Sequence, residues 1–306
     1  MMKNDRKSLF SGLGNQIITC VLCFFFGVLN ADNYKYDLAI GAIFRDEAPY
    51  LKEWIEFHKL VGVQHFYLFN NLSEDEYADV LAPYLAKGEV ELIEWPYHAE
   101  LLEKWVSVQG NAYSRCVHLA QNDKVKWLAL IDIDEFLTPM FEDNVLEVLK
   151  DYEEFGGVGF NWKLFGHSGL MDLPENKLLI ESLVMAAPQE RPTHLGVKSI
   201  VRPQRVQGCH HAHYVIYKKG FYHVNSNKKR CIDQQGVTNH VYYDRLVINH
   251  YWSRTGNYLY KKLLRWNAYA SDLVPEKWLE YVSDMNIVRD HSMERFVTPL
   301  HEKMGF

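Results

Sequence analysis

Strand-like and helix-like segments alternate through the first half of this 306-residue chain. Apolar runs of strand length cover residues 37–44, 65–69, 89–93 and 126–131. Segments with apolar residues at helical spacing separate these runs. Strands that alternate with helices in this way form parallel sheets with crossover helices. We therefore predict an α/β fold with a mostly parallel sheet flanked by helices.

The second half of the chain is less regular. Short strand-like pieces cover residues 158–162, 197–201, 213–217, 220–224 and 241–249. Helical patterns follow at residues 256–271, 275–284 and 288–303. Because 48% of the residues are hydrophobic, the chain can bury one large core. We predict one continuous domain over residues 36–306, with helices at its carboxyl end.

The amino-terminal segment, residues 1–31, has a different character. Lys3, Arg6 and Lys7 precede an apolar run at residues 17–29. This order is typical of a secretory signal peptide, and the run is shorter than the roughly 20 apolar residues of a membrane span. We predict a signal peptide or signal-anchor, with membrane association through the apolar run and a body in the secretory pathway or anchored to a membrane rather than on the cytoplasmic face. A buried first helix is the alternative.

Two carboxylates follow the apolar run at residues 126–131. Asp132 and Asp134 stand one residue apart, where the strand is predicted to end. Ligands of open α/β sheets bind outside the carboxyl ends of the strands, and Mg²⁺ and Mn²⁺ prefer carboxylate oxygens. The pair therefore predicts a site for Mn²⁺ or Mg²⁺, with Glu135 in a structural role. A strand that ends in a solvated acidic turn is the alternative.

Composition and missing motifs exclude several functions. The formal charge is −6, and the only dense basic block is Lys228–Arg230, so nucleic acid is not an expected partner. No G-x-G-x-x-G sequence follows the first strand, and no G-K-[ST] sequence occurs. These absences argue against a dinucleotide-binding domain and against a P-loop.

The order of these motifs resembles glycosyltransferase family 92 and the related family-2-like glycosyltransferases. The matching blocks are Gly41–Trp54, Phe66–Ser73, Lys126–Leu137, Lys198–Pro203, His211–His213 and Ile248–Tyr251, together with Lys261 and Lys262. The resemblance covers residues 37–265. It implies a GT-A fold, a nucleotide-sugar donor, a divalent metal ion and inversion at the anomeric carbon.

Polar residues at two strand ends are candidates for binding the donor. Arg45, Asp46 and Glu47 follow the first strand, and Asn70 and Asn71 follow the second. Carboxylates there can accept hydrogen bonds from ribose, the Arg45 fork can meet a phosphate, and the asparagine amides can read a uracil edge. A solvated turn with an Arg–Glu pair is the alternative for the first segment, and turn chemistry, which asparagine favours, is the alternative for the second.

Basic residues and histidines of the second half complete the predicted site. Lys198, Arg202 and Lys261 are predicted to contact diphosphate oxygens. His213 is predicted to join Asp132 and Asp134 as a metal ligand, and His250 is a second candidate. Surface histidines and solvated charges are the alternatives.

An inverting transfer needs a general base that takes the proton from the acceptor hydroxyl. Asp172 and Glu181 are the candidates for this catalytic role. We favour Asp172, because it lies in a loop after Gly166–Gly169 and loops carry many catalytic residues.

The function predicted from the sequence is a metal-dependent glycosyltransferase. It would move a sugar from a nucleotide-sugar donor, expected to be a UDP-sugar, to a glycan or another hydroxyl acceptor. One alternative is a nucleotidyltransferase with a related acidic metal site, although Arg45–Glu47 replaces the Gly-rich basic loop of that class. A second alternative is an inactive, carbohydrate-binding transferase-like module.

Overall fold

The computed structural model describes residues 33–98, 102–211, 213–231, 236–267 and 280–305. The chain divides into a unit of Met1–Asn33 and a unit of Tyr34–Phe306, and the fold below is that of the second unit. The predicted signal segment and its apolar run at residues 17–29 lie outside the described residues. Within the described residues, no helix is both long enough and apolar enough to cross a membrane.

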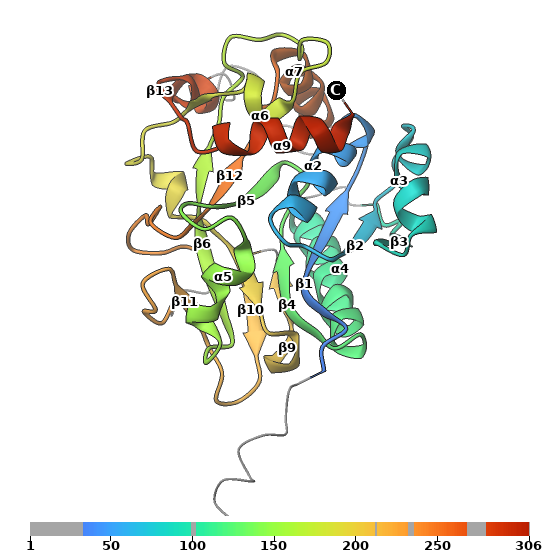
Figure 1. The fold of residues 1–306 in the computed structure, drawn as a ribbon, viewed down its shortest axis with the longest axis vertical. Coiled ribbons are helices and arrows are strands. Elements are labelled where there is room, and N and C mark those ends of the chain that lie inside the picture. Colours follow the sequence, from blue (N-terminus) through green and yellow to red (C-terminus); the bar gives the residue numbers. More distant parts are fainter. Residues whose placement is uncertain (1–32, 99–101, 212, 232–235, 268–279, 306) are drawn as a thin grey trace, which may run out of the picture. The chain divides into compact units, whose positions relative to one another are not determined.

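A nine-stranded sheet runs through the domain (Figure 1). Its strands have the order β3-β2-β1-β4-β8-β6-β12-β5, and β11 pairs with β6. Their bounds are β1 Tyr36–Phe44, β2 His65–Asn70, β3 Val90–Glu94, β4 Val125–Leu130, β5 Glu135–Pro139, β6 Gly157–Leu164, β8 Val197–Val201, β11 His223–Asn225 and β12 Leu246–His250. Two short pairs lie outside this sheet: β9 Val206–His211 with β10 Tyr214–Tyr217, and β7 Met185–Ala186 with β13 Val288–Arg289.

The strand directions match the predicted fold class. β1 is parallel to β2 and β4, β2 is parallel to β3, and β12 is parallel to β6. Antiparallel pairing enters only where β8 runs against β4 and β6, and where β5 runs against β12. The prediction of a mostly parallel α/β sheet flanked by helices, with helices near the carboxyl end, is confirmed.

Helices cover both faces of the sheet (Figure 1). Their bounds are α2 Ala48–Leu60, α3 Tyr77–Ala86, α4 Leu102–Asn122, α5 Val145–Leu149, α6 Leu179–Ser182, α7 Gly256–Asn267 and α9 Glu294–Met304. Four short 3-10 helices cover Lys150–Tyr152, Pro192–Leu195, Pro203–Arg205 and Asp284–Asn286.

Alternation along β1 creates two hydrophobic cores. Leu38 and Ile40 pack into the core with α2 and α3, whereas Ala39 packs into the core with α4. Side chains of a strand alternate between its faces, so a buried central strand must be apolar on both. Gly41 lies so close to the Cys116 side chain on α4 that a Cβ atom there would clash with its sulfur.

The strand β5 was not predicted from the sequence, and it positions the acidic motif. β5 begins at Glu135, directly after the two aspartates, and pairs with β12 so that Glu135 lies opposite His250. Its Pro139 and its short length are typical of an edge strand, which propensity alone does not reveal. This pairing brings the carboxyl-terminal half of the chain to the carboxyl end of β4.

Candidate functional site

The connection between β4 and β5 is a tight turn that presents Asp132 and Asp134. The Glu135 backbone N–H donates to the Asp132 carbonyl at 3.1 Å, and the Asp132 N–H donates to Glu135 Oε2 at 2.9 Å. The Trp162 indole donates to Glu135 Oε1 at 2.6 Å. Glu135 is fully buried, and burial raises its pKa to about 7. Its carboxyl group therefore fixes the turn instead of facing a ligand.

The Asp132 carboxylate binds a buried lysine. Lys198 Nζ on β8 lies 2.6 Å from Asp132 Oδ2 and 3.3 Å from Glu135 Oε2. The Tyr113 hydroxyl on α4 donates to Asp132 Oδ1 at 2.8 Å. Burial alone would raise the pKa of Asp132, but the Lys198 ammonium holds it below its ordinary value.

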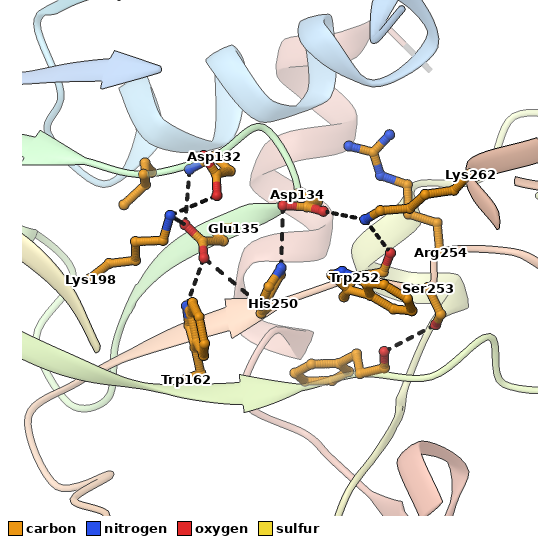
Figure 2. Close-up of polar contacts among 12 residues, drawn as sticks. Asp132, Asp134, Glu135, Trp162, Lys198, His250, Trp252, Ser253, Arg254 and Lys262 are labelled. Atoms are coloured by element: carbon orange, nitrogen blue, oxygen red, sulfur yellow. Dashed lines mark hydrogen bonds and ion pairs between the residues drawn. The ribbon is translucent and has the colours of Figure 1, made fainter. Parts of the chain in front are cut away.

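The Asp134 carboxylate lies between a histidine and a second lysine (Figure 2). His250 Nε2 is 3.4 Å from Oδ1, and Lys262 Nζ on α7 is 3.2 Å from Oδ2. Burial opposes ionisation of Asp134, but Lys262 and His250 hold its pKa well below the usual range. Asp134 is therefore ionised, and its Oδ1 faces the Nε2 atom of His250.

Asp134 and His250 form a pair that could hold a divalent cation. Their facing atoms are 3.4 Å apart, which one ion with ligand bonds of about 2.1 Å can span. Mg²⁺ and Mn²⁺ sites that act on phosphates commonly use one or two protein ligands and complete their shell with water and phosphate oxygens. The donor set of this pair therefore fits Mn²⁺ or Mg²⁺.

A buried arginine joins the turn after β1 to the segment before α7. Arg254 forms an ion pair with Glu47 and lies between the rings of Tyr50 and Tyr258, with its guanidinium carbon 3.7 Å and 4.5 Å from their centroids. The Tyr258 hydroxyl donates to Glu47 Oε1 at 3.0 Å. Arg254 Nε and Nη2 have no hydrogen-bond partner among the described residues, so two donors remain for a ligand.

Of the two predicted catalytic carboxylates, Asp172 lies closer to the cluster formed by Asp134, His250, Lys262 and Arg254. Its Oδ2 accepts from Asn257 Nδ2 at 2.7 Å, in the first turn of the helix that carries Lys262. Its charge also raises the pKa of Tyr50, although burial is the largest cause of that rise and other charges also contribute. The exposed side chain of Asp172 is therefore placed beside the cluster.

Glu181 has a different position. It accepts from the Leu178 N–H at 3.1 Å, lies 3.4 Å from Lys177 and is paired with His301 of α9 at 3.0 Å. These contacts fasten α6 to α9. The structure gives Glu181 a packing environment away from Asp134.

The residues predicted to bind the donor base have contacts within the protein. Asn70 donates to Glu94 at 2.8 Å, and Asn71 donates to the carbonyls of Trp95 and Tyr97 at 2.8 Å and 3.0 Å. Both asparagines are buried and tie together the ends of neighbouring strands. These contacts within the protein favour the alternative interpretation, in which the two asparagines have a structural role at the turn.

The turn after β1 divides its side chains between two directions. Asp46 Oδ1 accepts from the Glu74 N–H at 2.9 Å, and Arg45 Nε lies 3.7 Å from Asp46 Oδ2. Glu47, the third predicted residue, forms the ion pair with Arg254. The predicted donor-binding turn is thus joined to the acidic motif through Glu47.

The structure places the three other predicted residues differently. Lys198 reaches Asp132, whereas Arg202 follows β8 at the opposite end of the sheet, where it contacts Tyr34 and the Glu153 carbonyl. His213 lies near Trp162, and its Nδ1 is 3.1 Å from the Val197 carbonyl. Burial lowers the pKa of His213 to about 3, and the charges of Lys198 and Asp132 also act on it. His213 is therefore near Asp132, whereas His250 is within ion-pair distance of Asp134.

A second group with metal-ligand chemistry occurs at the other end of the sheet. Ligand atoms of His65, Glu91 and Asp123 lie within 4.8 Å of one another. The two oxygens of Asp123 already accept from Lys35 at 2.9 Å and from the Tyr67 hydroxyl at 2.8 Å. These hydrogen bonds give the group of His65, Glu91 and Asp123 a structural role. The group lies at the end of the sheet opposite Asp134.

Sequence reasoning missed Arg254 and Tyr113 and named Lys261 where Lys262 faces the site. A lone arginine or tyrosine carries no motif, so no local signal identified the first two. Helical phase can distinguish the two lysines, because consecutive side chains of a helix point about 100° apart. Lys261 is exposed, and Lys262 is directed to Asp134.

Comparison with known proteins gives a consistent result. The family model of glycosyltransferase family 92 matches residues 40–303. A family 92 protein of Ricinus communis is 26% identical over 226 residues, which are 71% of this chain and 35% of that protein. A family 92 protein of Oryza sativa subsp. japonica is 26% identical over 220 residues, 71% of this chain and 33% of that protein. The chain spans about a third of the length of these relatives.

Solved structures show only distant likeness. TarS 1–349 of S. aureus is 8% identical with a TM-score of 0.36, over 55% of this chain and 47% of that chain. Glucosyl-3-phosphoglycerate synthase from Mycobacterium tuberculosis, in complex with Mn²⁺, UDP and glucosyl-3-phosphoglycerate, is 12% identical with a TM-score of 0.31, over 56% of this chain and 58% of that chain. Likenesses of this extent carry no conclusion about the activity of this chain.

Proposed function

The chain belongs to glycosyltransferase family 92, and we propose that it transfers a sugar from a nucleotide-sugar donor, expected to be a UDP-sugar, to a hydroxyl group of a glycan or another acceptor. The observation that carries the proposal is the pair of Asp134 and His250 beside three cations, Lys198, Lys262 and Arg254. An oxygen and nitrogen pair for a divalent ion, with cations beside it, is suited to a sugar diphosphate.

Asp134 and His250 would hold the Mn²⁺ or Mg²⁺ ion in this proposal. When bound, the ion would neutralise charge that develops on the leaving nucleoside diphosphate. Asp132 contributes indirectly, because its carboxylate keeps the Lys198 ammonium at the end of β4. Glu135 holds the turn that carries both aspartates.

The cations have separate tasks in the proposed reaction. Arg254 is fixed by Glu47 and two aromatic rings, so its two remaining N–H donors are preorganised for phosphate oxygens. Transfer with inversion is a single displacement in which the acceptor hydroxyl attacks opposite the diphosphate. We assign the proton of that hydroxyl to Asp172, a loop residue whose carboxylate accepts from Asn257 in the first turn of α7.

The proposal is tested by measuring nucleoside diphosphate release from a panel of nucleotide sugars, with candidate acceptors and with Mn²⁺ or Mg²⁺. We expect acceptor-dependent release that EDTA abolishes and added Mn²⁺ restores. Release of pyrophosphate instead would favour a nucleotidyltransferase. Sugar binding without metal-dependent nucleotide binding or turnover would favour an inactive binding module.

The choice of base predicts different results for two conservative substitutions. We expect Asp172→Asn to lower kcat by about 10²- to 10⁴-fold with little change in donor affinity, because the amide cannot accept the proton. We expect Glu181→Gln to keep kcat within about twofold and to lower the melting temperature, because it weakens the contact between α6 and α9. Steady-state kinetics and thermal unfolding measure both variants. A normal kcat for Asp172→Asn would remove this residue from the chemistry.

A further inference from the structure

The two lysines at the acidic motif are held in different ways. Lys198 is fully buried and lies between two carboxylates, Asp132 and Glu135. Lys262 has one carboxylate partner, Asp134, and its Nζ also donates to the Trp252 carbonyl at 2.9 Å. The side chain of Lys262 is 13% exposed. Lys198 is therefore held by two carboxylates in the interior, whereas Lys262 is held by one carboxylate and is partly exposed to solvent.

The position of Lys262 conflicts with a divalent ion at Asp134. His250 faces one oxygen of the Asp134 carboxylate and Lys262 faces the other (Figure 2). An ion between Asp134 and His250 would thus lie within a few ångströms of the ammonium group. Like charges at such a separation in a partly buried site repel strongly. The ammonium must move when the ion binds.

The surroundings restrict where the ammonium can go. Lys262 Nζ lies 4.5 Å from the centre of the Trp252 ring and 5.8 Å from that of Tyr258. The four-carbon stem of a lysine is flexible, so its ammonium can move along these rings. The Glu47 carboxylate is already paired with Arg254. The negative charge that arrives together with the ion is the diphosphate of the donor.

We propose that Lys262 is a diphosphate-binding residue that Asp134 holds until a divalent ion takes its place. The ion replaces the ammonium at Asp134, and the ammonium turns to the phosphate oxygens. Binding of the ion and of the diphosphate is coupled by this exchange. The inference rests on the proposed function for the identity of the donor, but not for the exchange at Asp134.

The exchange is tested first by Mn²⁺ binding without nucleotide, measured by titration calorimetry. We expect Lys262→Met to bind Mn²⁺ about tenfold more tightly than the wild type, because the variant removes a competing charge and keeps the apolar stem. The matched control is Lys261→Met on the exposed side of α7, which should bind Mn²⁺ as the wild type does. Equal Mn²⁺ affinity of Lys262→Met and the wild type would overturn the exchange.

The second measurement is UDP binding at saturating Mn²⁺. We expect the effect to reverse, so that Lys262→Met binds UDP about tenfold more weakly, since a charge-assisted contact to phosphate is lost. Lys262→Arg keeps the charge and should recover most of the affinity. Unchanged UDP affinity of Lys262→Met, in a variant whose thermal unfolding shows it folded, would overturn the diphosphate contact.

The two hypotheses fail in different ways. If Lys262→Met binds Mn²⁺ more tightly but no nucleotide sugar is turned over by the wild type, the exchange stands and the proposed function fails. If the wild type turns over a nucleotide sugar but Lys262→Met and the wild type have the same Mn²⁺ affinity, the proposed function stands and the exchange is wrong.

Discussion

Replacing Asp134 with asparagine is expected to lower kcat/KM for the nucleotide sugar by about 10³-fold or more, which is the scale of losing a preorganised charge contact or a catalytic metal. Asparagine has the same shape as aspartate, so the turn between β4 and β5 should keep its backbone bonds. It lacks the negative charge that faces His250 at 3.4 Å and Lys262 at 3.2 Å. The loss should therefore come from the ion, not from the fold.

Two measurements separate those causes. Titration calorimetry should show that Asp134→Asn binds Mn²⁺ much more weakly than the wild type. Thermal unfolding in EDTA should show that Asp134→Asn is still folded at the assay temperature, with a melting temperature lowered because Lys262 and His250 lose their carboxylate partner. A variant with wild-type activity and wild-type Mn²⁺ affinity would show that Asp134 does not hold the ion.

Asp123 provides a matched control for this substitution. It is also an aspartate bound to a lysine, with Lys35 at 2.9 Å, but it lies at the other end of the sheet. We expect Asp123→Asn to keep full activity and Mn²⁺ affinity at the active site. A large loss of activity in this variant would instead point to the His65, Glu91 and Asp123 group.

The strand-end part of the site could be predicted from sequence for a physical reason. A parallel strand buried on both faces is a continuous apolar run, and residues 126–131 are such a run. The chain then places Asp132 and Asp134 at the carboxyl end, the edge where such sheets bind ligands. The mostly parallel sheet and the position of the motif at its edge were both predicted correctly.

The choice between the histidines depends on pairing that no local pattern shows. His250 reaches Asp134 because β12 pairs with β5 in one register, which places it opposite Glu135. β5 was not predicted, because a five-residue segment that begins with Glu135 and ends with Pro139 has no clear strand pattern. His211 and His213 have an equally suggestive spacing, and His213 lies next to Val197 and Trp162, on the side of Asp132 and Lys198.

The asparagines show the opposite problem, in which a plausible functional residue has a structural partner. Asn70 and Asn71 stand at the correct strand end, but Glu94, Trp95 and Tyr97 take their amide protons. Those partners come from the next strand and the loop after it. Sequence position alone cannot tell whether an amide at a strand end faces a ligand or a neighbouring strand.

Replacing Arg254 with methionine is expected to destabilise the protein by about 3–5 kcal/mol, the usual cost of removing one partner of a buried ion pair. The arginine side chain is fully buried, and Glu47 is 13% exposed. Without the guanidinium, the Glu47 carboxylate still accepts from the Tyr258 hydroxyl at 3.0 Å but has lost its ion-pair partner. Denaturant unfolding of the wild type and the variant measures the loss.

The loss should depend on pH in a defined direction. Burial already raises the pKa of Glu47, and Arg254 opposes that rise. Removing the arginine raises the folded-state pKa of Glu47 further above its unfolded value. Such a group destabilises the fold once the pH exceeds its unfolded pKa, and the penalty is absent where both states are protonated. We therefore expect the deficit of Arg254→Met to be larger at pH 8 than at pH 5.

A double substitution separates the buried charge from the lost packing. Glu47→Gln with Arg254→Met removes both members of the ion pair, so it should recover part of the stability and lose most of the pH dependence. The recovered protein should still bind UDP more weakly than the wild type, because the Arg254 donors that lack partners are gone. If the double variant recovers both stability and UDP affinity, Arg254 only neutralises Glu47. If stability returns without UDP affinity, the Arg254 guanidinium binds the nucleotide, and Glu47 and the two aromatic rings hold the guanidinium in position.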